Sequence, residues 1–111
     1  MYKELIHEET QQGFDIKLFA CEEHCSPDES YDYENEDHRK QIYEFIECNG
    51  LLGWCCMLVE VYKKGVKLGW DSLGGCSYAT VQDFLNDGYY ADMIDNALTS
   101  AKKTLQELNE G

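Results

Sequence analysis

The stretch that most restricts the fold is LLGWCCMLVEVYKKGVKLGW, residues 51–70, in which two β-rich runs flank the tripeptide KKG. A glycine at Gly65 permits the tight turn of a β-hairpin. Side chains alternate between the two faces of a strand, so one face of the first run carries only Met57, Val59 and Val61. The stretch therefore predicts an antiparallel hairpin with one fully apolar face.

Two earlier segments also have the period of regular structure. Residues 14–20 alternate in the manner of a strand, and residues 35–48 have helical spacing followed by the helix-ending dipeptide Asn49-Gly50. Acidic residues in the first helical turn suit the helix dipole. The positions that carry these patterns are Phe14, Ile16, Leu18 and Ala20 in the strand, and Glu36, Asp37, Ile42, Phe45, Ile46 and Asn49 in the helix.

Two helices are expected after the glycine-punctuated loop DSLGGCSY. Thr80 and Asp83 have the spacing of a capping box, which predicts a short helix that stops at Gly88. From Tyr90 onward, apolar residues recur at helical spacing towards residue 108. These residues are Ile94, Ala97, Leu98, Ala101, Leu105 and Leu108.

We therefore predict a single acidic α+β domain over residues 1–111, in two layers and in the order β-α-β-β-α-α. Its three-stranded antiparallel sheet would carry the helices on one face. The rows expected to meet them are Phe14, Ile16 and Leu18; Met57, Val59 and Val61; and Val66, Leu68 and Trp70.

The same alternation sends a second apolar set to the opposite face of the sheet. This set consists of Phe19, Trp54, Cys56, Leu58 and Tyr62. Contiguous exposed apolar area usually has a reason, which predicts a self-association surface, such as that of a homodimer, at Phe19, Trp54, Leu58 and Tyr62. The alternative is that the acidic loop before the first helix folds over this face.

The charge of the chain restricts its partners. The 22 acidic and 9 basic residues give a formal net charge of −13. Phosphates would be repelled, which argues against direct binding of nucleic acid or of an anionic membrane. A basic protein partner is favoured, and the alternative is that the excess acid only keeps the protein soluble.

The distribution of the acids points to a binding surface. Ten acids lie between Glu22 and Glu47, whereas residues 68–101 hold five acids and no base. In an extended segment, alternate carboxylates would project on one side at intervals of about 6.6 Å. Tyrosines set among them are the type of anchor found in interface hot spots. The predicted partner-binding residues are Asp28, Glu29, Tyr31, Asp32, Tyr33, Glu34, Glu36, Asp37, Asp87, Tyr89, Tyr90 and Asp92.

The segment MYKELIHEET lacks the pattern of a secretory signal, and no run approaches membrane-spanning length. The six cysteines are therefore expected to stay reduced, in the cytoplasm of a host cell. The cluster CEEHC invites a zinc site. Cys21 and Cys25 would lie about 13 Å apart in a strand, however, and Cys55 and Cys56 would face opposite ways. We expect no metal and no cofactor.

Catalysis is also not expected. His7, His24 and His38 are the available neutral-pH bases, and no elbow motif frames a serine or cysteine. The LGGC sequence at residues 73–76 lacks the basic residue and the helix start of a phosphate loop. The sequence favours a binding protein over an enzyme.

The stretch from GWCCMLVEVYKKGVKLGWDSLGGCSY through TVQDFLNDGYYADMI resembles small uncharacterised proteins carried by phages, plasmids and other mobile elements. The motif is LGGC-S-Y followed by the Asp-Phe helix, and the resemblance covers about half of the chain. Acidic proteins of this kind are often anti-CRISPR or anti-restriction inhibitors, some of them DNA mimics. The resemblance implies an inhibitor that occupies the basic nucleic-acid channel of a defence nuclease or effector complex. The alternatives are an immunity protein or antitoxin that neutralises a basic toxin, and a zinc or redox module.

Overall fold

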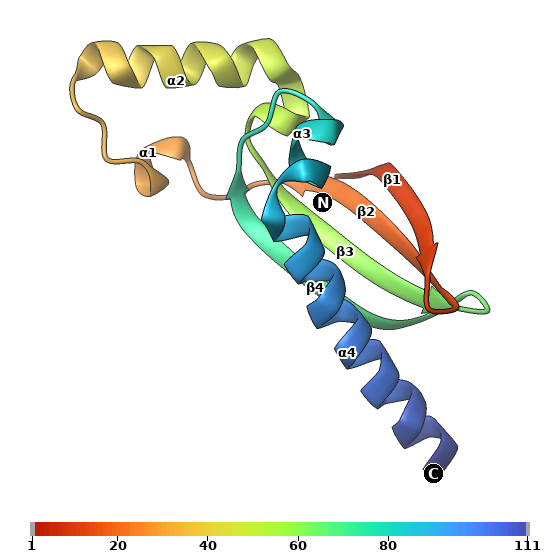
Figure 1. Cartoon of the computed structure of the whole chain (residues 1–111). Helices are drawn as coiled ribbons and strands as arrows, with labels where there is room; N and C mark the ends of the chain where they lie inside the picture. The colour runs from red at the N-terminus through yellow and green to blue at the C-terminus, as the bar shows by residue number, and fades with distance from the viewer. Residues whose placement is uncertain (1, 111) are drawn as a thin grey trace.

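In a computed structural model that describes residues 2–110, four strands form one antiparallel sheet in the order β1-β2-β3-β4 (Figure 1). The strands are β1 (Lys3–Gln11), β2 (Phe14–Glu22), β3 (Cys55–Lys63) and β4 (Val66–Cys76). The predicted three-stranded sheet is therefore wrong, and so is the predicted order. An additional strand, β1, precedes the others, and the chain runs β-β-α-α-β-β-α-α.

The helices separate and follow the two β-hairpins. They are α1 (Pro27–Ser30), α2 (Glu36–Asn49), the 3₁₀ helix η1 (Gly50–Gly53), α3 (Val81–Asn86) and α4 (Gly88–Glu110). The predicted starts of α2 and α3 are confirmed by their N-caps. The Asn35 side chain accepts from the His38 amide at 2.9 Å, and Thr80 accepts from the Asp83 amide at 3.1 Å.

The same two-residue turn closes both hairpins. Gln12 and Lys64 have φ angles of 53° and 51°, and Gly13 and Gly65 have φ angles of 81° and 79°. Positive φ at both central residues matches the right-handed twist of the flanking strands. The predicted hairpin at residues 51–70 is confirmed, and its glycine stands where the left-handed backbone requires it.

The strand β1 was missed because its side chains towards α4 are mostly polar, and only Ile6 among its described residues packs against the core. His7 and Glu9 pair with Leu18 and Ile16 in β2 and so share their face. The Tyr90 hydroxyl of α4 donates to the Glu9 carboxylate at 2.7 Å. A register shift between Leu5 and His7 further interrupts the alternation. Because β1 contacts α4 through the hydrogen bond between Glu9 and Tyr90, its sequence has no alternating apolar row that would predict a strand.

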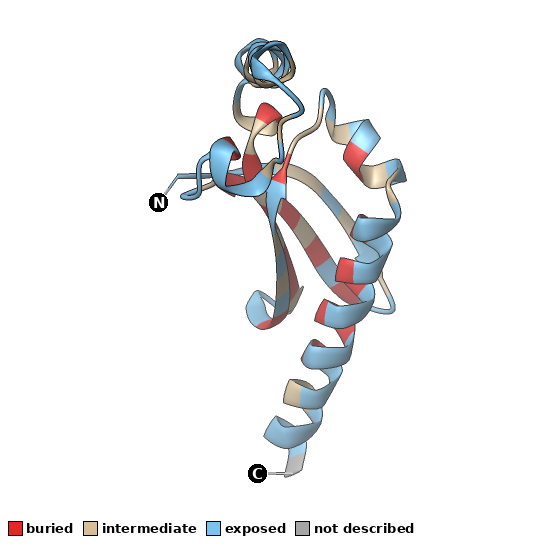
Figure 2. Cartoon of the chain, turned by 90° about the vertical axis from the view of Figure 1, so that its left-hand side faces the viewer, coloured by how far each residue is buried: buried red, intermediate tan, exposed pale blue. Residues whose placement is uncertain are grey.

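The core lies between α4 and one face of the sheet (Figure 2). The buried residues include Ile16, Leu18, Met57, Val59 and Val61 from the strands, and Met93, Ile94, Ala97, Leu98 and Ala101 from α4. The helix approaches β4 closely at Gly69, because a β-carbon there would lie 2.7 Å from the Ala101 nitrogen and closer still to the Ala97 carbonyl oxygen. Glycine and alanine at this crossing bring the helix into contact with the sheet.

The row Val66, Leu68 and Trp70 does not share one buried face, contrary to the prediction. The pairing of β3 with β4 shifts between Val61 and Tyr62 and leaves Leu68 without an opposite residue. Leu68 is buried, whereas Trp70 pairs with Glu60 and is 58% exposed. The bulge therefore moves Trp70 to the face that α4 does not cover, which we call the outer face.

The helix α2 lies beyond the end of the sheet and does not cover it (Figure 1). It buries none of its described residues, and Phe45 on its apolar stripe is 43% exposed. Its C-terminal turn is held against η1, since a β-carbon at Gly53 would lie 2.8 Å from the Ile46 α-carbon. The expectation that the helices all pack on the sheet is wrong for α2. No helix within residues 2–110 is long and apolar enough to cross a membrane.

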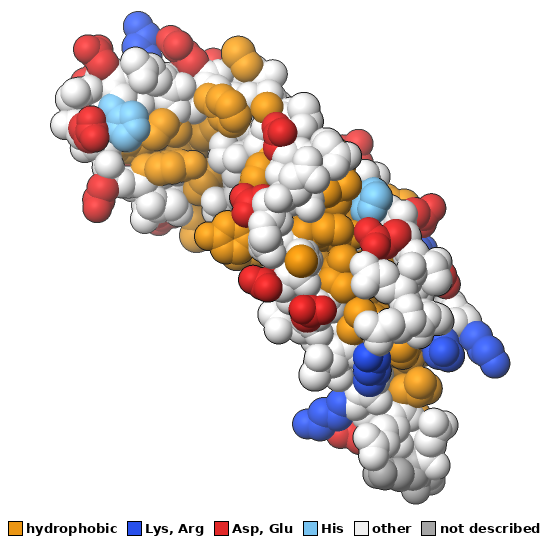
Figure 3. Space-filling model, in the orientation of Figure 1, with side chains coloured by type: hydrophobic (Ala, Val, Ile, Leu, Met, Phe, Trp, Pro, Cys, Tyr) orange, Lys and Arg blue, Asp and Glu red, His pale blue; other side chains and the backbone are white. Residues whose placement is uncertain are grey.

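The molecule is elongated, with extents of 57 × 26 × 22 Å, and its charge is uneven along this length. Five of the nine lysines and arginines lie near the hairpin turns or the C-terminal part of α4, which we call the basic end. Figure 3 shows basic side chains gathered where α4 terminates. The five residues of the basic end are Lys63, Lys64, Lys67, Lys102 and Lys103. The acidic segment, residues 28–37, lies at the opposite end (Figure 1).

Candidate partner-binding site

The acidic segment is anchored by an ion pair between α1 and α2. Arg39 Nε donates to Asp28 Oδ1 at 3.0 Å, and Nη2 donates to Oδ2 at 3.1 Å. This two-point geometry is stronger and more specific than a single hydrogen bond between an arginine and a carboxylate. The hydrogen bonds from Arg39 lower the pKa of Asp28. Asp28 is therefore ionised, and the positive charge of Arg39 balances its negative charge. Because its two oxygens are held by Arg39, Asp28 fixes the position of the segment.

Two further acids of the segment have internal roles. The Glu29 carboxylate accepts from the Ser26 amide at 2.9 Å and caps the start of α1. Glu36 Oε1 lies 3.6 Å from Arg39 Nη1, and both residues belong to α2. The exposed carboxylates without such a partner among the described contacts are Asp32, Glu34 and Asp37.

The loop at residues 31–35 alternates as the sequence predicts, but Glu36 already belongs to α2. Asp32 and Glu34 are exposed, whereas Tyr31 and Tyr33 are half-buried. The rings of the two tyrosines stack with their centroids 6.1 Å apart. Tyr31 also packs against Trp54, at 5.7 Å between ring centroids. The carboxylates thus face solvent above a layer of aromatic rings.

Trp54 belongs to this aromatic layer and not to the outer face, where the alternation placed it. It follows η1, and its indole nitrogen donates to the Cys25 carbonyl at 2.7 Å. Burial, followed by the Asp28 carboxylate, raises the pKa of Tyr33 to about 12, so this phenol stays protonated at neutral pH. The Tyr33 hydroxyl is shielded from solvent and has no hydrogen-bond partner in the part of the chain that the structure describes.

A polar pocket of about 350 Å³ opens beside the aromatic layer. Tyr31 lines it from the acidic segment, Tyr89 from the start of α4, and Tyr78 and Asp87 from the loops that flank α3. The Tyr78 hydroxyl donates to Asp87 Oδ2 at 2.8 Å. Burial and this hydrogen bond raise the pKa of Tyr78. We call this site the tyrosine pocket.

The floor of the tyrosine pocket is the Gly74-Gly75 end of β4, and a carboxylate holds it in place. Glu23 Oε2 accepts from the Gly75 amide at 2.7 Å, and Oε1 accepts from the Cys25 amide at 3.3 Å. Gly75 has a φ of +67°, which favours glycine. The LGGC stretch therefore forms the base of this pocket.

The structure brings together some of the predicted partner-binding residues and separates others. Tyr31 lines the same pocket as Asp87 and Tyr89 although it is far from both in sequence. Tyr90 is buried at 6% exposure and cannot be an exposed anchor. Asp92 is exposed on α4, outside the residues that line the pocket. Sequence reasoning missed Glu23 and Tyr78; the only available signal was their position beside the acidic segment and the glycine pair.

The outer face carries the predicted self-association residues Phe19, Leu58 and Tyr62, all of them half-buried. Lysine side chains cover part of this area: Lys3 lies 4.3 Å from the centroid of the Phe19 ring, and Lys17 lies 5.0 Å from that of Tyr62. Long lysine stems can shield apolar surface while their ammonium groups stay in water. Self-association through this face stays a prediction. The acidic segment contributes no lining residue to the shallow pocket on it, which Cys56, Leu58 and Trp70 border.

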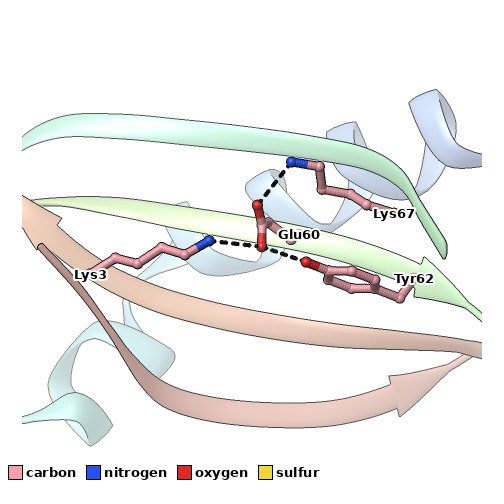
Figure 4. Close-up of polar contacts among 4 residues, drawn as sticks. All are labelled: Lys3, Glu60, Tyr62 and Lys67. Atoms are coloured by element: carbon pink, nitrogen blue, oxygen red, sulfur yellow. Dashed lines mark hydrogen bonds and ion pairs between the residues drawn. The ribbon is translucent and has the colours of Figure 1, made fainter. Parts of the chain in front are cut away.

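Glu60 lies at the centre of the outer face and is buried beneath a polar network (Figure 4). It accepts from the Tyr62 hydroxyl at 2.8 Å and pairs with Lys67 at 3.2 Å and Lys3 at 3.4 Å. Burial raises the pKa of Glu60, but the hydrogen bonds from Tyr62 and Lys67 and the lysine charges outweigh burial and lower it. The network stabilises an ionised, buried carboxylate.

Among the candidates for chemistry, four cysteines lie opposite one another on neighbouring strands, Cys21 with Cys56 and Cys55 with Cys76. Cys55 and Cys76 are buried, and burial raises their thiol pKa values to about 12 and about 11. His7 contacts Glu9 at 3.0 Å, and His38 accepts from the Glu34 amide at 3.1 Å. Within residues 2–110, no three histidine, cysteine or acidic side chains are grouped to hold a metal ion.

The comparisons with known proteins find no relative. No protein-family model matches the chain, and neither a curated protein nor a solved structure matches it.

Proposed function

We propose that the protein is a non-enzymatic inhibitor whose acidic end binds the basic nucleic-acid-binding surface of a host defence nuclease or effector complex. One observation carries the proposal. Exposed carboxylates and exposed or half-exposed tyrosines gather at the end of the molecule opposite the basic end, around a pocket that no described lysine or arginine lines.

The charges of the acidic segment support the proposal. Some of its acids are bound within the protein, whereas others have no described partner. Asp28, Glu29 and Glu36 position the segment, which leaves Asp32, Glu34 and Asp37 to face a partner. Charges of one sign on a rigid support increase the rate of encounter with an oppositely charged surface. The anchored segment needs little ordering upon binding, which reduces the entropic cost.

The support from packing is the aromatic layer under these carboxylates. Tyrosine combines a large apolar ring with a polar tip and is enriched in interface hot spots. Tyr89 is 55% exposed, and Tyr31 is half-buried against Trp54. We propose that the carboxylates accelerate association and that the tyrosines slow dissociation.

The test measures inhibition of DNA binding by purified restriction enzymes and CRISPR effector complexes, with labelled duplex DNA and fluorescence anisotropy. The variant Asp32→Asn, Glu34→Gln, Asp37→Asn removes the three free carboxylates. The control Glu8→Gln, Asp95→Asn, Glu107→Gln removes the same charge from exposed positions elsewhere. We expect association of the first variant to slow about tenfold and to lose most of its salt dependence.

The control variant should associate at close to the wild-type rate, because its substitutions lie away from the acidic segment. It should also fold normally, since exposed charges contribute little to stability. Equal losses in the two variants would mean that net charge alone matters. Failure of the wild-type protein to compete with DNA on any member of the panel would refute the proposal. Neutralisation of a basic toxin by the same surface would reassign the protein to the immunity class.

A further inference from the structure

The tyrosine pocket contains one carboxylate, that of Asp87, of which only one oxygen accepts a hydrogen bond from a described side chain. Tyr78 donates to Asp87 Oδ2, and no other described side chain donates to Oδ1. Asp87 is half-buried, so its charge is less screened than that of a fully exposed acid. No lysine or arginine within residues 2–110 lines the pocket. One oxygen of a fixed carboxylate is thus available to a donor that enters from outside.

The rest of the lining suits a planar cation. Tyr31 and Tyr89 contribute aromatic rings to the pocket, and a cation is attracted to the face of such a ring within about 6 Å. The glycine floor leaves backbone without side chains, and Glu23 holds it in place through the Gly75 amide. The lining therefore offers the exposed ring of Tyr89 and the carboxylate of Asp87 as an acceptor.

We propose that this pocket receives one arginine side chain of the basic partner, with its guanidinium donating to Asp87 Oδ1 and stacking on Tyr89. The inference rests on the proposed function and names the group that the pocket recognises. A guanidinium has donors around its edge and flat faces, so it can use the carboxylate and the ring together. A lysine ammonium would form the ion pair but could not stack.

Other ligand classes fit less well. A phosphate or carboxylate would face Asp87 without any compensating base in the described lining. A purely apolar group would bury the carboxylate without a donor for its second oxygen, which costs free energy. The pocket therefore selects for positive charge.

The test uses the full chain, labelled with ¹⁵N, and three synthetic hexapeptides of arginine, lysine or citrulline. We expect the arginine peptide to shift the backbone amides of residues 74–78 and 87–89. The lysine peptide should bind several-fold more weakly, and the uncharged citrulline peptide should cause no shift at these positions.

Two variants then probe the pocket. Asp87→Asn keeps an oxygen for the Tyr78 hydroxyl but removes the charge, and Tyr89→Ala removes an exposed ring. Each should weaken binding of the arginine peptide by about tenfold. Asp95→Asn, at an exposed position of α4 outside the pocket, is the matched control and should change the affinity little. Unchanged ¹⁵N spectra away from each site would verify that the fold is intact.

The outcomes separate this inference from the proposed function. Shifts confined to residues 31–37, or equal losses for Asp87→Asn and Asp95→Asn, would overturn the arginine pocket while leaving the acidic surface in place. Equal binding of the lysine and arginine peptides would also overturn it. Absence of binding by both cationic peptides would contradict both proposals.

Discussion

The close approach of α4 to β4 gives the sharpest stability prediction. We expect Gly69→Ala to destabilise the protein, because the added carbon would lie 2.7 Å from the Ala101 nitrogen and 3.0 Å from the Ala101 β-carbon. Ordinary contacts begin near 3.4 Å. The helix must therefore retreat by roughly 1 Å, since the obstructing atoms include rigid backbone. The buried alanines along α4 would then lose contact with the sheet.

Overpacking of this kind costs about 1–3 kcal/mol, and we expect the upper half of that range because the clash involves helix backbone. Urea unfolding followed by circular dichroism measures the change. For a domain of this size, a loss of about 2 kcal/mol shifts the midpoint by about 1 M.

The matched control is Gly88→Ala, at the first residue of α4. An added carbon there meets no atom within 4 Å, and its backbone φ is not in the left-handed region. Alanine in a helix is favoured over glycine by up to about 1 kcal/mol, so the midpoint should stay the same or rise. Equal midpoints for Gly69→Ala and Gly88→Ala would refute the reasoning.

The remaining predictions concern protonation and thiols. The pKa of Glu60 is lowered by folding, so its stabilising contribution is present above the unfolded value of 4.5 and is lost as the pH falls through the folded value. The urea midpoint should therefore drop in acid, and less so in Glu60→Gln. Tyr90→Phe removes the hydrogen bond to Glu9 and should cost about 1 kcal/mol in the same assay, with no change if that contact is absent in solution. A native-state thiol titration should find Cys25 and Cys48 fast and Cys55 slow, because the first two are exposed and burial raises the pKa of the third.

The central hairpin and β2 were predictable because their buried rows are wholly apolar. The starts of α2 and α3 were predictable because Asn35 and Thr80 cap them locally. Such signals depend on a few neighbouring residues and do not require knowledge of the tertiary structure. The strand β1 gave no such signal, since its contact with α4 is a hydrogen bond between Glu9 and Tyr90.

The candidate site was predictable in composition but not in geometry. The acids and tyrosines of residues 28–37 stand out in the sequence, and so does the lack of bases in residues 68–101. Their meeting around Asp87 depends on where α1, β4 and α4 end relative to one another, which periodicity does not encode. The exposure of Trp70 likewise depends on one bulge, and a one-residue change of register moves a side chain to the other face.

The placement of five lysines at one end and the acidic segment at the other makes the molecule an electric dipole along its long axis. In the field of a cationic surface, such a body experiences a torque as well as an attraction. The torque would turn the end that carries α1 and α2 towards the cationic surface before contact, and it would turn the basic end away from that surface. Reversing the charges of Lys102 and Lys103 would thus add attraction yet weaken the alignment, so a more acidic molecule would arrive in the wrong orientation more often.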